Sequence, residues 1–116
     1  MSANQVELLI FEVNGHRYGA DAGEVLRIDR PGAARDVGLP LGAPRTSAKT
    51  LVFRGDDGHE KSLRVDAVHG VQTVDASALR RLPPMMNTNS AHCIGAWLDG
   101  ATTVVLVSLS SMAAGA

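Results

Sequence analysis

Residues 50–74, TLVFRGDDGHEKSLRVDAVHGVQTV, contain two β-strands joined by a turn and a third strand that follows them. Leu51–Phe53 form the first strand. The dipeptide Asp57-Gly58 predicts a two-residue turn, because glycine adopts the positive φ angles that such a turn needs. From Leu63 to Val68, apolar side chains alternate with charged ones, which indicates one buried and one solvent-facing side. The stretch therefore predicts antiparallel β-structure.

Two more Asx-Gly dipeptides lie between apolar runs. Asn14-Gly15 separates residues 6–13 from 16–21, and Asp99-Gly100 separates residues 93–98 from 102–109. Such dipeptides between extended runs are the strongest short-range signal for a hairpin. The apolar run 104–107 suits a strand covered on both faces. Together the three hairpins predict about seven strands and an all-β domain.

Three segments between the hairpins have other patterns. Residues 21–30, DAGEVLRIDR, fit either a helix face or a turn that runs into a strand, and one helical turn before a strand is favoured. Residues 31–47 are rich in glycine and proline and predict a loop. Residues 75–82, DASALRRL, predict a short helix that Asp75 or Ser77 caps and that Pro83-Pro84 ends.

Composition narrows the class of protein. The chain has 116 residues, which is the length of one domain, and 45% of them are hydrophobic, as in a globular protein. The net charge of −1 provides no field for nucleic acid or anionic lipid. The single cysteine excludes an internal disulfide, and neither a signal peptide nor a membrane-length apolar run is present. We therefore expect a soluble cytoplasmic domain.

No residue pattern indicates catalysis. The four histidines are scattered, so we expect no metal site. Cys93 has apolar neighbours and is expected to be a buried small hydrophobic residue, not a nucleophile. No nucleophile elbow and no phosphate-binding loop is found. We therefore expect no catalytic residue and no cofactor, and a protein that works through its surfaces.

The order of the elements resembles the CheW-like family, the coupling proteins of bacterial chemosensory systems. Three blocks carry the resemblance: residues 8–28 (LLIFEVNGHRYGADAGEVLRI), 63–74 (LRVDAVHGVQTV) and 82–112 (LPPMMNTNSAHCIGAWLDGATTVVLVSLSSM). They look like the family's opening strand pair, its Val-Asp-x-Val region and its closing hairpin. Family members carry a further segment between the first two blocks, and here residues 31–47 take its place.

The resemblance implies a fold of SH3-type β-barrels with short helices and a groove between the barrels. The whole chain, residues 1–116, would be one CheW-like domain, with an incomplete first barrel at about residues 6–47 and a second barrel at about 48–112. Short members of this kind occur beside full-length couplers, including in Frz-type systems. Missing strands would expose strand edges, so we expect a rearranged first barrel or a homodimer.

The resemblance also implies a non-catalytic adaptor that binds the cytoplasmic tip of a methyl-accepting chemoreceptor. Further expected partners are a CheA-type histidine kinase or another CheW-like protein, with no nucleic acid and no membrane insertion. The alternative function is a small-ligand-binding or enzyme-accessory β-barrel, with residues 31–47 as a lid. The partner-binding candidates are Val25, Arg27, Ile28, Arg30, Arg54, Val65, Val68 and Val71. The apolar residues among them could equally be ordinary residues of the hydrophobic core.

Overall fold

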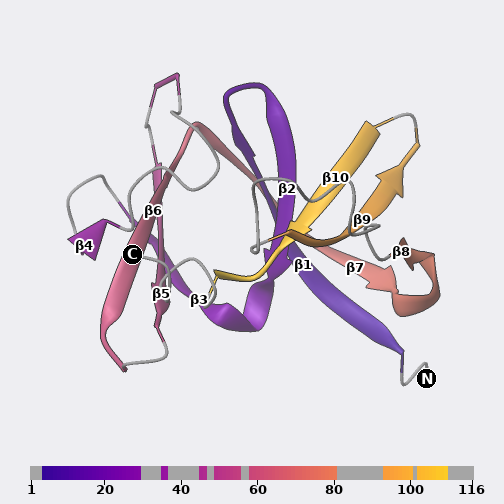
Figure 1. The fold of residues 1–116 in the computed structure, drawn as a ribbon, viewed down its shortest axis with the longest axis horizontal. Coiled ribbons are helices and arrows are strands. Elements are labelled where there is room, and N and C mark those ends of the chain that lie inside the picture. Colours follow the sequence, from indigo (N-terminus) through magenta and orange to yellow (C-terminus); the bar gives the residue numbers. More distant parts are fainter. Residues whose placement is uncertain are drawn as a thin grey trace.

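The computed structural model describes residues 4–29, 35–36, 45–46, 49–55, 58–80, 93–100 and 102–109. These parts of the chain form a six-stranded sheet in the order β7-β1-β2-β10-β9-β8 and a four-stranded sheet in the order β3-β5-β6-β4 (Figure 1). The strands are β1 (Gln5–Val13), β2 (His16–Asp21), β3 (Val25–Asp29), β4 (Arg35–Asp36), β5 (Lys49–Arg54), β6 (Glu60–Val65), β7 (Ala67–Asp75), β8 (Leu79–Arg80), β9 (Cys93–Asp99) and β10 (Thr102–Val107). The all-β class is confirmed.

The turn between β1 and β2 has the predicted chemistry. Asn14 and Gly15 have φ angles of 52° and 83°, and Val13 pairs with His16 across them. Two positive φ angles match the right-handed twist of the strands that the turn joins.

The turn between β5 and β6 is longer than predicted. Arg54 pairs with Glu60, so residues 55–59 lie between the strands, and a two-residue turn at Asp57-Gly58 is wrong. The Gly55 amide donates to the His59 carbonyl at 2.9 Å, and the Gly58 amide donates to the Gly55 carbonyl at 3.0 Å. Gly58, with a φ angle of 82°, still supplies the left-handed residue that reverses the chain.

Helical structure in the described residues is limited to two 3₁₀ turns. The first, η1 (Ala22–Glu24), precedes β3, as favoured for residues 21–30. The second, η2 (Ala76–Ala78), replaces the expected helix at 75–82, because β8 begins at Leu79 and pairs with β9. Asp75 does cap this turn, and its carboxylate accepts from the Ser77 amide at 3.0 Å. No helix in the described residues is long and apolar enough to cross a membrane.

Strand β1 is buried on both faces, and each face belongs to a different apolar cluster. Cluster 1 lies between the two sheets and consists of Leu9, Phe11, Val13, Ala20, Leu51, Phe53, Leu63, Val65, Val107 and Leu109. Cluster 2 lies on the opposite face of the six-stranded sheet and consists of Leu8, Ile10, Val74, Val104 and Leu106, with Val6, Leu79 and Trp97 packed against it. Alternation along β1 explains the division, because successive side chains of a strand point to opposite faces.

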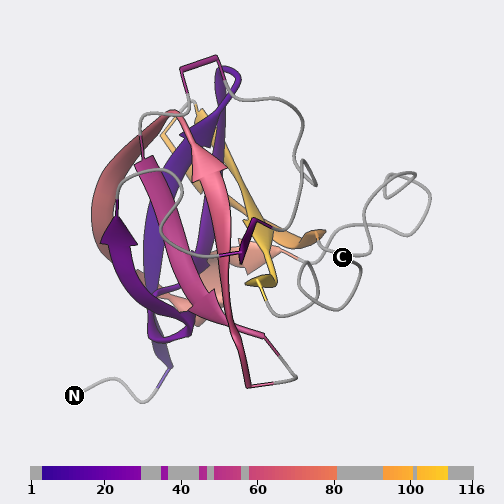
Figure 2. The same cartoon turned by 90° about the vertical axis from the view of Figure 1, so that its left-hand side faces the viewer.

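The six-stranded sheet curls around cluster 2. Its two edge strands, β7 and β8, are separated in the chain only by the three residues of η2. A connection this short requires the two edges to approach each other, so the sheet bends over its own apolar face. Figure 2 shows the four-stranded sheet in front of this sheet, on the side of cluster 1. In the described residues no strand pairing joins β7 to β8, so the curled sheet is open.

Strand pairing does not divide the chain at residue 47. Strand β1 pairs with β7, β2 pairs with β10, and β3 pairs with β5. Each sheet therefore takes strands from both of the ranges, about 6–47 and about 48–112, that the family resemblance assigns to separate barrels. An incomplete first barrel remains a prediction, because much of residues 31–47 lies outside the described residues.

Candidate functional site

Strand β3 forms an edge of the four-stranded sheet and presents apolar side chains to solvent. Leu26 and Ile28 are each 45% exposed. A β-bulge between Val25 and Arg27 leaves Leu26 without an opposite residue in β5. A bulge reorients side chains at a strand edge, which accounts for the exposure of two neighbouring apolar residues. Leu26 is not among the residues predicted from the sequence, although its position beside Val25 and Ile28 was the available signal.

A charged group accompanies this apolar edge. The Arg27 guanidinium donates to the Glu60 carboxylate at 2.9 Å and to the Asp29 carboxylate at 3.3 Å. These bonds, the one to Glu60 first, raise the pKa of Arg27, and the bond from Arg27 lowers the pKa of Glu60. Arg54 lies opposite Glu60 in the sheet and adds a smaller attraction. The two carboxylates thus fix the guanidinium of Arg27.

The other predicted partner-binding residues lie in different environments. Val65 is buried in cluster 1, and Val25 and Val68 are partly buried against it. Val71 is 54% exposed but lies on β7, in the other sheet. Arg30 lies outside the described residues. The structure therefore places Arg27 and Arg54 around Glu60, leaves Ile28 exposed on the edge strand, and makes Val65 a core residue.

Asp66, between β6 and β7, ties three segments together. One carboxylate oxygen accepts from the Asn14 amide at 2.7 Å, and the other accepts from the Thr46 amide at 2.5 Å and from its hydroxyl at 3.1 Å. These bonds, the Thr46 amide first, hold the pKa of Asp66 far below its ordinary value. In addition, Arg45 Nε donates to the Asn14 side-chain oxygen at 3.1 Å. The aspartate of the Val-Asp-x-Val region thus has a structural role and links these segments by hydrogen bonds.

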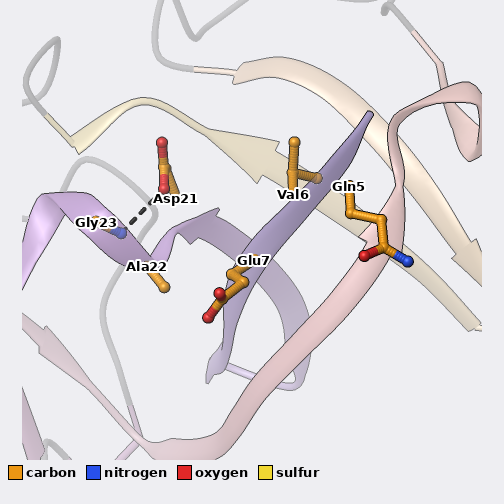
Figure 3. Close-up of a pocket in the computed structure, with 6 residues that line it drawn as sticks. All are labelled: Gln5, Val6, Glu7, Asp21, Ala22 and Gly23. Atoms are coloured by element: carbon orange, nitrogen blue, oxygen red, sulfur yellow. Dashed lines mark hydrogen bonds between the residues drawn. The ribbon is translucent and has the colours of Figure 1, made fainter. Parts of the chain in front are cut away.

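Cluster 2 opens onto a surface hollow at one end of the curled sheet. Figure 3 shows the outer part of this hollow, about 530 Å³, between Gln5, Val6 and Glu7 of β1 and the segment Asp21–Gly23. An inner groove of about 340 Å³ shares Val6, Glu7 and Asp21 with it. The inner groove is lined by Val6, Glu7, Leu8, Gly19, Asp21, Glu24, Leu79, Ile94, Leu106, Val107 and Ser108.

The described residues contain no cluster of three or more histidine, cysteine, aspartate or glutamate side chains suited to a metal ion. The side chain of Cys93 and the whole of His92 lie outside the described residues, so the prediction for Cys93 stays as it was. The loop 31–47, the expected lid of a small-ligand site, also lies largely outside them.

Comparisons with known proteins find a similar sequence and a similar fold, which are described next. No family model matches the chain. The Frizzy aggregation protein FrzB of Myxococcus xanthus is 41% identical over 105 residues, which cover 90% of this chain and 91% of FrzB. The crystal structure of the scaffolding protein TtCheW from Thermoanaerobacter tengcongensis matches with a TM-score of 0.73 over 92% of this chain and 91% of that chain. At 16% identity, this second likeness shows the fold.

Proposed function

Because the chain belongs to the CheW-like family and is similar to FrzB over most of its length, we propose that it is a non-catalytic adaptor of a bacterial chemosensory array. A scaffolding role follows from the family. The finer proposal is that the chain binds the cytoplasmic helical tip of a methyl-accepting chemoreceptor. With that partner, the protein would act in the cytoplasm.

The observation that carries the proposal is the exposed edge of β3. Leu26 and Ile28 offer apolar surface, and Arg27, which lies between them in the chain, is fixed by Glu60 and Asp29. An amphipathic helix binds through apolar residues that dock on such a surface, while a positioned charge sets its orientation. Because two carboxylates already hold Arg27, little side-chain entropy is lost when the partner binds.

A binding assay with variants of β3 tests this proposal. The purified chain is titrated with a chemoreceptor cytoplasmic fragment, and the double variant Leu26→Ser/Ile28→Ser is compared with Leu98→Ser. Leu98 is 65% exposed and lies on β9, in the other sheet, so it is a matched control. We expect affinity for the receptor fragment to fall about tenfold or more in the β3 variant only, because buried apolar anchors dominate such interfaces. Equal affinity of all three proteins would contradict the proposal.

The same binding assay, with other proteins in place of the receptor fragment, tests the other expected partners. Binding to both the receptor fragment and the regulatory domain of a CheA-type kinase would make the chain an ordinary coupler. Binding to the receptor fragment alone supports a spacer or competitor within the array. Sedimentation of the chain alone, and in a mixture with another CheW-like protein, tests the homodimer and the mixed complex.

A further inference from the structure

The inner groove is a continuation of cluster 2 that the fold leaves unfilled. Leu8 and Leu106 of the cluster, with the adjoining Val6 and Leu79, form its apolar walls. Ile94, at its margin, is 57% exposed. Exposed apolar surface that is continuous with a core is a common mark of a binding site.

Gly19 of β2 lets the apolar side chains of cluster 2 pack directly against the backbone beside the groove. A Cβ atom on Gly19 would lie 3.2 Å from both Leu106 and Val104 and 3.4 Å from Ile10, so Gly19 faces cluster 2. The next residue of β2 on the same face is Asp21, because side chains alternate along a strand. The carboxylate of Asp21 therefore lies directly beside the apolar surface at Gly19.

Among the described residues, the charged side chains that line the groove all have one sign. Glu7, Asp21 and Glu24 line it, and no lysine, arginine or histidine of the described residues does. Asp21 accepts a hydrogen bond from the Gly23 amide at 2.9 Å. Within the described parts of the chain, the side-chain carboxylates of Glu7 and Glu24 have no hydrogen bond or ion pair. The carboxylates are thus available to a cation at the edge of an apolar slot.

We propose that this groove docks a cationic, apolar segment of a partner protein. Its volume of about 340 Å³ is at the lower end of the range of ligand pockets and has room for roughly two aliphatic side chains. Lysine or arginine residues that flank those side chains would pair with Glu7, Asp21 and Glu24. The charge pattern favours such a segment over a second copy of this chain, whose net charge is −1. This surface is distinct from the apolar edge of β3, although Glu24 immediately precedes that strand.

The test is an NMR titration of the isotopically labelled full chain with a short synthetic peptide of leucine and lysine. The control peptide has glutamate in place of lysine. We expect saturable shifts at Leu79, Ile94 and Leu106 with the lysine peptide, weakened by added salt, and none with the glutamate peptide. Shifts confined to β3, or equal shifts with both peptides, would overturn the proposal.

Variants of the chain test the carboxylates and the apolar wall of the groove independently. We expect the double variant Glu7→Gln/Glu24→Gln to weaken lysine-peptide binding by several-fold to about tenfold. The control is Gln72→Lys/Thr103→Lys, which makes the same change in net charge at exposed sites outside the groove. Ile94→Ser is expected to weaken binding about tenfold, and Leu98→Ser on the same strand is its control.

Two results would reassign the groove. Shifts at Leu79 and Leu106 that depend on the concentration of the chain itself, without peptide, would mean that a second copy docks there. Absence of lysine-peptide binding to a folded chain would mean that the groove is closed to outside segments. Either result would overturn the proposal of a cationic partner segment.

Discussion

The two apolar clusters that share strand β1 differ in how completely they are enclosed. Cluster 1 is covered by both sheets, and its Phe11, Phe53, Leu51 and Leu109 are all fully buried. In cluster 2 the sheet bends over its own face and leaves the groove at one end. Leu8, Ile10, Val74 and Leu106 of cluster 2 keep a small exposed fraction, whereas Val104 has none.

The difference separates an enclosed core from an apolar face that remains accessible. Both aromatic side chains of the buried core, Phe11 and Phe53, belong to cluster 1, and Tyr18 stacks on Phe11 with ring centroids 5.8 Å apart. Aromatic side chains bury the most area per residue, so cluster 1 contributes the larger share of the apolar stabilisation. The less enclosed cluster 2 is the one at which we propose that a partner segment docks.

The largest effect is expected for Phe53→Ala in cluster 1. Phe53 is fully buried between the sheets, so its truncation leaves a closed cavity as well as removing apolar contacts. Such changes cost about 3–5 kcal/mol, which is a large part of the total for a domain of this size. Urea denaturation measures the loss. A cost no larger than that of the surface variant Leu98→Ser would mean that the sheets do not pack as described.

Leu106→Ala in cluster 2 is expected to cost less, about 2 kcal/mol, at the lower end of the range for buried leucines. Leu106 lines the groove, so part of the space it vacates is continuous with solvent and does not become a dry cavity. The same denaturation experiment compares it with Leu63→Ala, a buried leucine of cluster 1. If both variants lost equal stability, the two clusters would be equally enclosed, contrary to the comparison.

Two glycines sharpen the description of cluster 2. A Cβ atom on Gly95 would lie 2.6 Å from the carbonyl oxygen of Arg80, so Gly95→Ala must push β8 away from β9. We expect a loss of about 1–3 kcal/mol and faster hydrogen exchange at Leu79. In Gly19→Ala the new methyl group meets only side-chain atoms at 3.2 Å or more, which can move. That variant should be milder, and a reversed order would contradict the described pairing of β8 with β9.

The sequence was informative where one local rule determined the outcome. The Asn14-Gly15 turn and the run 104–107, covered on both faces, followed from dipeptide chemistry and periodicity, and the structure confirms both. The helix expected at 75–82 was wrong because pairing of β8 with β9, which is distant in sequence, overrides local propensity. Sheet order is likewise set by long-range pairing, such as that of β2 with β10, which no local pattern encodes.

The candidate surfaces were less predictable than the strands. Ile28 and Val65 are both apolar strand residues, yet one is exposed and the other is in cluster 1. Periodicity gives alternation along a strand but does not tell which strand lies at an edge. The groove forms where three strands bring Gly19, Leu79 and Ile94 together. Nothing in the order of the residues along the chain indicates that these three lie close to one another.

The smallest effect at neutral pH is expected for Asp66→Asn, at the junction between the strands of the two sheets. The amide oxygen of asparagine can still accept from Thr46 or from Asn14, but its NH₂ group cannot accept from the other. The variant should therefore fold, with a lower melting temperature than the wild type.

Its pH dependence is the sharper measurement. The folded pKa of Asp66 is below its ordinary value of 3.8, so the stability that its charge provides is complete above that value. This stability is lost as the pH falls toward the folded pKa, because the unfolded chain then binds the proton first. Glu60 and Asp75, whose pKa values are also lowered, titrate in both proteins and cancel in the comparison. The difference in melting temperature between wild type and Asp66→Asn should thus begin to narrow as the pH falls from neutral to about pH 3. A difference that is constant with pH would mean that Asp66 joins the two sheets through its shape and not through its charge.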